Sequence, residues 1–424
     1  MPDKPSHSTT PATSSKGAGA LDGLRVIDLS RILAGPWATQ ALADLGADVI
    51  KVESPGSGDG TRVWGPPFLP DTEAADKPAD AAYYTACNRN KRSITIDFAQ
   101  PEGADLVREL VRDADVLVEN FKLGGLKKYG LAYDDLKALN PGLVYCSITG
   151  FGQTGPYAHR PGYDFLIQAM GGLMSVTGEP DEQPGGGPMK TGVAICDLFT
   201  GMYATVSILA ALRHRDNTGQ GQHIECSLLD TQVAMLANQA SNYLVGGVTP
   251  GRMGNDHPNV VPYKAYASRD GHVIITCGND GQFSRLCAVL GCSELATDSR
   301  FSTNADRILH RDALDELLNE KISQLDSSAL ISLLEAANVP CGPIHDVPAV
   351  FNNEQVIARE LQVDMQRDDG TPVSTVAFPV RLAETPASYR IAPPSLGADT
   401  EAVLQELTGM DDERLRKLSA AGII

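Results

Sequence analysis

Positive charge is scarce in this sequence. The chain has 35 lysines and arginines against 53 aspartates and glutamates, which gives a formal net charge of −18 at pH 7. Because a strongly negative surface repels other polyanions, this balance argues against nucleic acids and anionic membranes as partners. The hydrophobic content of 42% is ordinary for a globular protein, and 424 residues allow two or three domains.

Long apolar segments and targeting signals are also lacking. No uninterrupted apolar run approaches the roughly 18 to 20 residues that a membrane-spanning helix needs. The first twenty residues are rich in Ser, Thr, Pro and Ala, without the apolar centre of a secretory signal or the arginines of a mitochondrial one. We therefore expect residues 1–20 to be a disordered leader on a cytoplasmic protein that does not contact membranes.

Cysteine pairs of the CxxC type are absent. The eight cysteines are scattered and stand mostly in apolar surroundings: Cys87, Cys146, Cys196, Cys226, Cys277, Cys287, Cys292 and Cys341. This distribution is typical of buried thiols in a reducing compartment, and it does not indicate a metal site.

The first half of the chain alternates between strand and helix patterns. "LRVIDLS" predicts a buried strand from Leu24, "AGPWATQALADLGA" a helix with Pro36 in its first turn, and "DVIKVE" a second strand. The alternation returns twice before residue 152, which predicts an open parallel α/β sheet whose ligands bind beyond the carboxyl ends of the strands. No GxGxxG follows the first strand, so a dinucleotide-dependent dehydrogenase is not indicated.

The pattern changes near Tyr263. "KAYASRDGHVIITCG" predicts a hairpin that turns at Arg269–Gly271, and helical patterns follow over 282–290, 305–325 and 328–336. We expect a large domain over 21–224, a smaller α+β domain over 225–330, and a return linker over 331–424. That last segment completes the large domain with a final pair of helices.

One carboxylate interrupts the apolar stretch "MKTGVAICDLFTGMYATVSILAALRHR". Asp197 could cap a helix, because apolar residues recur at helical spacing after it and the segment closes on basic residues. Asp197 could instead be a carboxylate nucleophile in a dry pocket, and the two roles are compatible. Asp164, which opens an earlier helical pattern, is a natural cap as well.

Several cations cluster in the expected loops of this acidic chain: Arg31, Arg62, Arg89, Lys91, Arg92, Lys122, Lys127 and Lys128. Together with the helix start at Gly35 they could hold a polyphosphate. They could equally balance the acidic surface. The loop "GEPDEQPGGGPMKTG" could be a lid or a plain surface turn.

The segments "DLSRILAGPWATQALADLGADVIKVESPGSGDGTR", "NRNKRSITID", "VENF", "SITGFGQTGPY", "GYD" and "DLFTG" resemble the family III CoA-transferases, the CaiB–BaiF family. The resemblance runs in order from about Leu21 to the C-terminus. It implies an interlocked homodimer, each subunit having a Rossmann-like large domain that binds CoA as a substrate, with no permanent cofactor. It makes Asp197 the nucleophile, through a mixed aspartyl anhydride and an aspartyl-CoA thioester, and it does not give Asp164 that role.

The resemblance and the cationic loops together assign the CoA contacts to Arg31, Ala34, Arg92, Asn120, Phe121, Lys128 and Tyr163. Lys128 stands where the family often has Arg, which keeps the charge and gives up a bidentate fork. Racemases of the same fold use a His at the position of Tyr163. An α-methylacyl-CoA racemase is therefore the less favoured alternative.

The segment "GRMGNDHPNVVPY" bears on the acid that is activated. Formyl-CoA transferases carry a glycine-rich loop in this region, and this segment is poor in glycine. It looks closer to the dicarboxylate branch, typified by succinyl-CoA–glutarate CoA-transferase. Arg252 and His257, with Lys264 nearby, are candidates to pair with a distal carboxylate, although His257 could be a loop imidazole bonded to backbone. Oxalate or formate, malate, citramalate and carnitine are the alternative acids.

Overall fold

The computed structural model describes residues 19–70 and 79–424, and the expected leader lies mostly outside them. The chain divides into two compact units. The large unit runs to Ile167 and continues with Ala194–Thr231 and Arg359–Ile424, and the small unit consists of Gln168–Val193 and Gln232–Ala358. These ranges differ from the expected ones in three respects: the second part of the small unit begins at Gln232 rather than 225, the unit extends to Ala358, and it includes the glycine-rich loop.

A six-stranded sheet forms the centre of the large unit, and all its neighbouring strands are parallel. The strand order is β3-β2-β1-β4-β5-β6. The strands are Arg25–Asp28 (β1), Asp48–Glu53 (β2), Lys91–Thr95 (β3), Val116–Glu119 (β4), Val144–Thr149 (β5) and His223–Ser227 (β6). The predicted parallel α/β sheet is confirmed, and the order reverses between β1 and β4.

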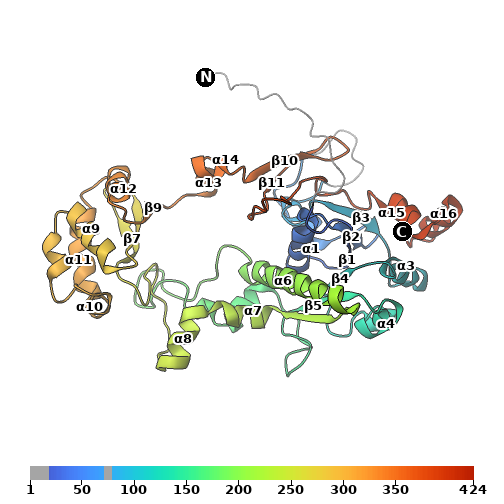
Figure 1. The fold of residues 1–424 in the computed structure, drawn as a ribbon, viewed down its shortest axis with the longest axis horizontal. Helices are drawn as coiled ribbons and strands as arrows, with labels where there is room; N and C mark the ends of the chain where they lie inside the picture. The colour runs from blue at the N-terminus through green and yellow to red at the C-terminus, as the bar shows by residue number, and fades with distance from the viewer. Residues whose placement is uncertain (1–18, 71–78) are drawn as a thin grey trace, which may run out of the picture. The chain divides into compact units, whose positions relative to one another are not determined.

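Aliphatic side chains cover both faces of this sheet. On one face, Val26 and Val49 pack in a cluster with residues of α1 (Ala34–Asp44) and α6 (Ile195–Thr218). On the other face, Ile27 and Ile50 pack with α3 (Pro101–Val111), α15 (Thr400–Thr408) and α16 (Asp412–Ala420). Alternate residues of one strand reach opposite layers, as the pleat requires. Figure 1 shows α1 and α6 side by side.

Helix α6 is the longest helix in the described part of the chain, at 24 residues. By length and composition alone it could cross a membrane, which corrects the expectation that no segment approaches that length. Core helices share this property. Residues such as Ala204, Ile208 and Leu212 are buried against the sheet and α1, so the position of α6 accounts for its apolar character.

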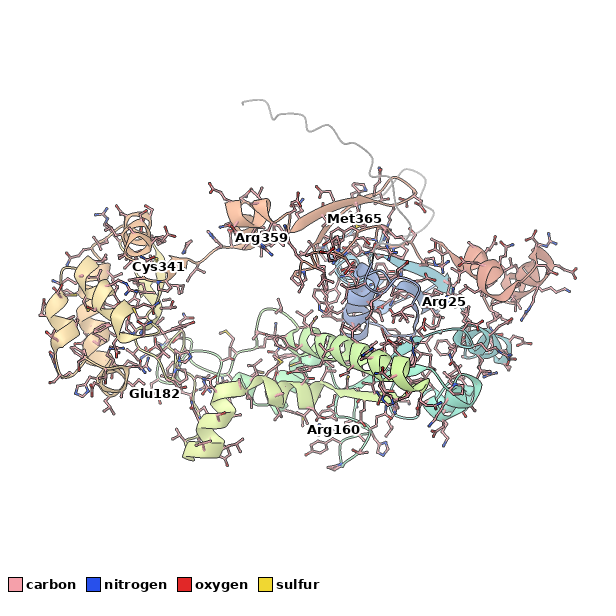
Figure 2. The ribbon with its side chains drawn as sticks, viewed as in Figure 1. Arg25, Arg160, Glu182, Cys341, Arg359 and Met365 are labelled. Atoms are coloured by element: carbon pink, nitrogen blue, oxygen red, sulfur yellow. The ribbon has the colours of Figure 1, made fainter. Side chains whose placement is uncertain are left out.

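Shorter helices and strands link the main elements of the large unit. They are Gly60–Val63 (η1), Ala82–Thr85 (α2), Lys127–Tyr129 (η2), Tyr133–Leu139 (α4), Asp164–Met170 (α5), Leu228–Met235 (α7), Gln362–Gln366 (β10) and Pro372–Val376 (β11). Helix α5 begins in the large unit and ends in the small one, and α7 crosses the boundary at Thr231 in the same way. Arg359 begins the returning segment, and Met365 lies in β10 (Figure 2).

The small unit has its own sheet and core. Its three-stranded antiparallel sheet consists of Tyr263–Ala267 (β7), His272–Thr276 (β8) and Cys341–Pro343 (β9). The predicted hairpin is confirmed, with Ser268 and Gly271 closing its turn. The other elements are Leu173–Ser175 (η3), Ala237–Gly246 (α8), Asp280–Val289 (α9), Ser293–Thr297 (η4), Asn304–Leu309 (α10), Arg311–Ile322 (α11), Ser327–Ala336 (α12), Val347–Phe351 (α13) and Glu354–Ala358 (α14).

Candidate active site

Asp197 lies in the first turn of α6, as its third residue. The helix begins two residues earlier, and its N-cap position is occupied by Ala194, which offers no side-chain cap. The capping role considered for Asp197 is therefore not observed. Its carboxylate stands at the positive end of a long helix dipole, which favours a negative charge there.

The cap comes from Asp164 instead. Its Oδ1 accepts a hydrogen bond of 2.7 Å from the Cys196 main-chain N–H, one residue before Asp197. Asp164 is itself the first residue of α5, so one carboxylate ties the starts of two helices together. The sequence indicated a cap at Asp164, but the helix that it caps is α6, 32 residues further along the chain.

Burial and charge both act on Asp197. Its side chain is half-buried, and burial, followed by the charge of Asp164, raises the pKa of the Asp197 carboxyl from 3.8 to about 7. In the part of the chain that the structure describes, no ion pair to a Lys or Arg offsets this rise. A carboxylate with a raised pKa and an incomplete solvent shell is a stronger nucleophile than one in water.

Two further neighbours of Asp197 carry no sequence motif. Tyr83 of α2 has its pKa raised to about 12 by burial and then by the charge of Asp197, which places its phenol within electrostatic reach of the carboxylate. The Cys196 thiol also has a raised pKa, through burial and the neighbouring Asp164. Both groups keep their protons at neutral pH. Tyr83 is 114 residues away along the chain, so no local pattern could have indicated it.

A second group of predicted residues meets where the strand order reverses. Arg31 follows β1 and Asn120 follows β4, and their amide groups pair reciprocally: the Arg31 N–H donates to Asn120 Oδ1 at 2.9 Å, and Asn120 Nδ2 donates to the Arg31 carbonyl at 2.6 Å. The Arg31 guanidinium lies 4.7 Å from the Phe121 ring centroid. This reversal is the place where open α/β sheets bind ligands.

Ala34, Lys128 and Tyr163 also lie on the carboxyl side of their strands. Ala34 is the first residue of α1, whose start has no side-chain cap, so its first-turn N–H groups are suited to an anion. Lys128 of η2 is exposed and stacks 4.5 Å from the Tyr129 ring centroid. Tyr163 directly precedes Asp164, and its side chain is 64% exposed.

Arg92 does not lie with this group, and its predicted loop position is wrong. It is the second residue of β3, near the amino end of the strand. Its guanidinium is bidentate to Asp48 and also pairs with Glu406 of α15. These two carboxylates were distant in sequence, so the local run of cations gave a misleading signal. Arg92 joins the sheet to the C-terminal helices.

Other cations of the same cluster are buried in ion pairs. Arg89 is bidentate to Asp44, and the Lys91 ammonium lies 3.1 Å from Asp28. Arg62 is bidentate to Glu53 and also reaches Asp80. These carboxylates neutralise the three cations inside the large unit. Structural pairing, rather than a shared phosphate site, therefore explains why they are present.

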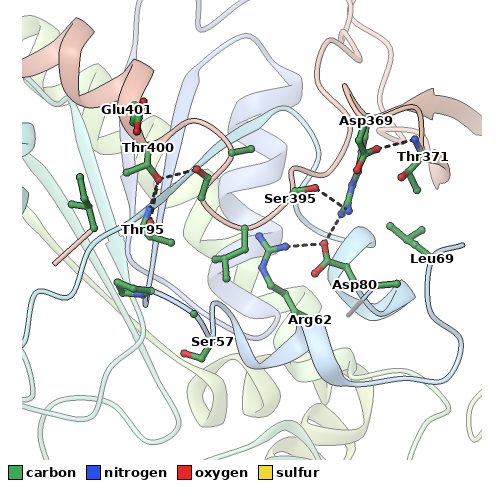
Figure 3. Close-up of a pocket in the computed structure, with 18 of the residues that line it drawn as sticks. Ser57, Arg62, Leu69, Asp80, Thr95, Asp369, Thr371, Ser395, Thr400 and Glu401 are labelled. Carbon is green, nitrogen blue, oxygen red and sulfur yellow. Dashed lines mark hydrogen bonds and ion pairs between the residues drawn. The ribbon is translucent and has the colours of Figure 1, made fainter. Parts of the chain in front are cut away.

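A cavity of about 1100 Å³ opens beside the ends of β2 and β3 in the large unit. Figure 3 shows Arg62 beside Asp80, whose carboxylate lies 2.9 Å from the Arg62 guanidinium. The same carboxylate lies 2.7 Å from the Arg367 guanidinium. Arg367 also donates to the Pro393 carbonyl at 2.7 Å. The two cations are already engaged by the protein, so this cavity does not offer them to an anion.

The three candidates for the distal carboxylate all lie in the small unit. Arg252 pairs with Asp181 and donates to the Glu179 carbonyl. The His257 Nδ1 accepts from the Asn259 N–H at 3.0 Å, which is the backbone-bonded arrangement considered for this residue and leaves the ring proton on Nε2. Lys264 is bridged between Asp256 and Asp315, so its charge is compensated.

Residues 19–70 and 79–424 contain no group of three or more His, Cys, Asp or Glu side chains that could hold a metal ion. The site combines a carboxylate whose pKa is raised with a guanidinium, an aromatic ring and an uncapped helix start that follow the carboxyl ends of β1 and β4. Acyl transfer through a covalent carboxyl intermediate fits this combination.

Comparison with known proteins decides the family. A family model described as CoA-transferase family III matches residues 21–400. The chain belongs to CoA-transferase family III. The predicted resemblance is thereby confirmed, and the protein is a CoA-transferase of this family.

Individual members of the family are similar over nearly the whole chain. Succinate–glutarate CoA-transferase of Agrobacterium fabrum is 52% identical over 388 residues, which cover 91% of this chain and 95% of the relative. Human succinyl-CoA:glutarate CoA-transferase is 40% identical over 95% of this chain and 90% of its own length. A crystal structure of a CaiB/BaiF family protein from Brucella suis aligns with a TM-score of 0.80 and 52% identity, covering 92% of this chain and all of that one.

Proposed function

We propose that this CoA-transferase moves CoA from succinyl-CoA to a dicarboxylate, glutarate first, with Asp197 as the nucleophile. The observation that carries the proposal is the position of Asp197 at the start of α6, half-buried and beside Asp164. The choice of acid rests on two relatives that are named for succinate or succinyl-CoA and glutarate. Arg252 and His257 are proposed to bind the distal carboxylate of the acid.

The proposed reaction has four steps. An Asp197 oxygen attacks the thioester carbonyl of succinyl-CoA, giving a mixed anhydride and the CoA thiolate. The thiolate attacks the aspartyl carbonyl, which releases succinate and leaves an aspartyl-CoA thioester. A glutarate carboxylate displaces the thiolate to form a second anhydride, and the thiolate then attacks its glutaryl carbonyl, giving glutaryl-CoA and the free Asp197 carboxylate.

The raised pKa of Asp197 assists the first step. A rise from 3.8 to about 7 corresponds to at most roughly 4 kcal/mol against the charged form. Forming the anhydride replaces that charge by a neutral acyl group, so the unfavourable burial of the ion is relieved as the bond forms. The negative charge passes to the oxyanion that forms at the attacked carbonyl and then to the thiolate. Each oxyanion needs N–H donors, and the loss of one such donor raises the barrier by about 2.7 to 4 kcal/mol.

The loops that follow the carboxyl ends of β1 and β4 form the proposed CoA site. Arg31 and Phe121 offer a guanidinium and an aromatic face, and Asn120 fixes the loop between them. The uncapped start of α1 at Ala34 can accept a phosphate. Lys128 supplies a positive charge that no carboxylate pairs with among residues 19–70 and 79–424. Tyr163 stands next to Asp164 and is proposed to contact the acyl-CoA near the reacting carbonyl.

A second copy of the chain is the proposed partner. Phe199, Met202, Tyr203 and Val206 recur at helical spacing on α6 and are 39% to 60% exposed, so they form an exposed apolar stripe on this helix. A homodimer that covers this stripe agrees with the assembly implied by the family resemblance. All eight cysteines are free thiols, which supports a reducing cytoplasmic location.

The test of this function is a comparison of acceptors. Purified protein is given succinyl-CoA with glutarate or butyrate, and the new acyl-CoA is quantified by mass spectrometry. A charge-assisted hydrogen bond to the distal carboxylate is worth about 1.5 to 3 kcal/mol, so kcat/KM for glutarate should exceed that for butyrate about ten- to hundred-fold. Equal rates with both acids would refute the dicarboxylate specificity and leave the family assignment intact.

A further inference from the structure

Side chains hold every main-chain polar group of the short segment from Ser30 to Ile32, directly after β1. The three N–H groups donate to carboxylate or amide oxygens, and the three carbonyls accept from side-chain donors. In chain order, the partners of the N–H groups are Asp28, Asn120 and Asp59, and those of the carbonyls are Lys51, Asn120 and Cys87. Side-chain hydrogen bonds, rather than regular secondary structure, therefore hold this segment in place.

Ile32 needs such support more than its neighbours. Its φ of +74° lies in the left-handed region, where a β-branched residue is disfavoured. Its N–H donates to both carboxylate oxygens of Asp59, at 3.2 Å each, and its carbonyl accepts from the Cys87 thiol. A residue held in this conformation by surrounding groups is more often found at functional sites than elsewhere.

Several hydrogen bonds hold the Asp59 carboxylate in place. Its side chain is buried, and it accepts from the Lys51 ammonium at 2.9 Å and from the Thr61 N–H and hydroxyl at 3.0 Å and 2.9 Å. The Asp59 N–H donates to Glu53 at the end of β2. Chiefly through Lys51 and Thr61, these contacts lower the pKa of Asp59 to about 2 against the effect of its burial, so the carboxylate is ionised throughout the working pH range.

We propose that Asp59 is a positioning residue for acyl-CoA, because it holds Ile32 in its left-handed conformation and so sets the path of the chain between Arg31 and Ala34. The inference rests on the proposed CoA site at the carboxyl ends of β1 and β4. Asp59 itself is not proposed to touch the ligand. It acts through the Ile32 peptide, whose orientation determines how Arg31 and the start of α1 are placed for the ligand.

A double-mutant cycle separates this role from general stability. Glycine adopts a φ of +74° without steric conflict, so Ile32→Gly removes the need for the clamp. The affinity for free CoA is measured by calorimetry for wild type, Asp59→Ala, Ile32→Gly and the double variant, and circular dichroism verifies folding. If Asp59→Ala does not fold, Asp59→Asn takes its place, since the amide keeps the shape and loses one of the two acceptor oxygens.

We expect Asp59→Ala to weaken CoA binding at least tenfold in the wild-type background and no more than about threefold in the Ile32→Gly background. Equal losses in both backgrounds would overturn the positioning role, because they would trace the effect to the loss of the Lys51–Asp59 ion pair. That result would leave the proposed function standing. Failure of wild-type protein to bind CoA at all would overturn the proposed function and this inference together.

Discussion

The Asp164 carboxylate accepts a hydrogen bond from the Cys196 N–H, one residue before the carboxylate of Asp197. Asp164 thus caps the helix that carries Asp197 and at the same time raises the pKa of Asp197 through its charge. One residue positions the proposed nucleophile and increases its basicity. The two effects can be separated, because an asparagine at position 164 keeps the oxygen that accepts the hydrogen bond and removes the charge.

The first prediction concerns pH. Because Asp197 must be ionised to attack, kcat/KM for the acyl-CoA should rise with pH and reach half its limit near pH 7. In Asp164→Asn the repulsive charge is gone, so the pKa of Asp197 falls and the rise moves to lower pH. The measurement is a pH–rate profile of both proteins with one acyl-CoA. A wild-type midpoint near 4, or identical midpoints, would contradict the electrostatic coupling.

The second prediction concerns stability. A carboxyl whose pKa is raised on folding stabilises the protein below its unfolded value of 3.8, and this contribution is lost as the pH rises through about 7. Asp197→Asn mimics the protonated form, so it should melt roughly 2 to 4 °C above wild type at pH 8. The difference should vanish near pH 4. Equal melting temperatures at pH 8 would show that the ionised carboxylate is not disfavoured in the folded state.

How much of the fold could be predicted from the sequence depends on how far apart along the chain the interacting residues lie. The strands β1 and β2 were readable because they are runs of buried aliphatic residues. Strand β6, "HIECS", was missed because polar residues hide its pattern. Its residues are strand-like only beside β5, to which they are paired in register.

The site could be predicted only in part, because some of its residues stand in local motifs and others depend on partners far away along the chain. Asp197 and the pair Arg31–Asn120 stand in motifs that local sequence displays. The cations Arg89 and Lys91 were placed in a ligand loop because their partners, 45 and 63 residues away, cannot be seen locally. The glycine-rich loop joins the small unit through contacts such as that of Gly254 with the Gly178 carbonyl, which are equally remote in sequence.

The third prediction contrasts two cations. Lys128 is exposed, with no carboxylate paired to it in the described part of the chain, so Lys128→Ala should raise the KM of several acyl-CoAs three- to tenfold by similar factors. Arg92→Ala should leave KM unchanged and reduce stability by about 0.5 to 1.5 kcal/mol, because it loses its pairing with Asp48 and Glu406. Steady-state kinetics and urea unfolding provide the two readouts. A raised KM in Arg92→Ala would restore it to the CoA site.

The fourth prediction concerns the acid. Arg252 is paired with Asp181, so an incoming distal carboxylate must compete for its guanidinium. Arg252→Ala should lower kcat/KM for glutarate at least tenfold and for butyrate much less. Asp181→Asn should favour glutarate over butyrate, because it weakens the competing pair and keeps Arg252 in place. If both variants reduce the two acids alike, Arg252 serves only to anchor the loop that contains Asp181.

The most direct test of the central claim is to trap the activated carboxyl. Wild-type protein is incubated with succinyl-CoA and hydroxylamine, digested, and searched by mass spectrometry for a hydroxamate, with Asp197→Ala and Asp164→Asn treated in parallel. We expect the modification on Asp197 in wild type and Asp164→Asn, and none in Asp197→Ala. A hydroxamate on Asp164, or transfer activity retained in Asp197→Ala, would contradict it.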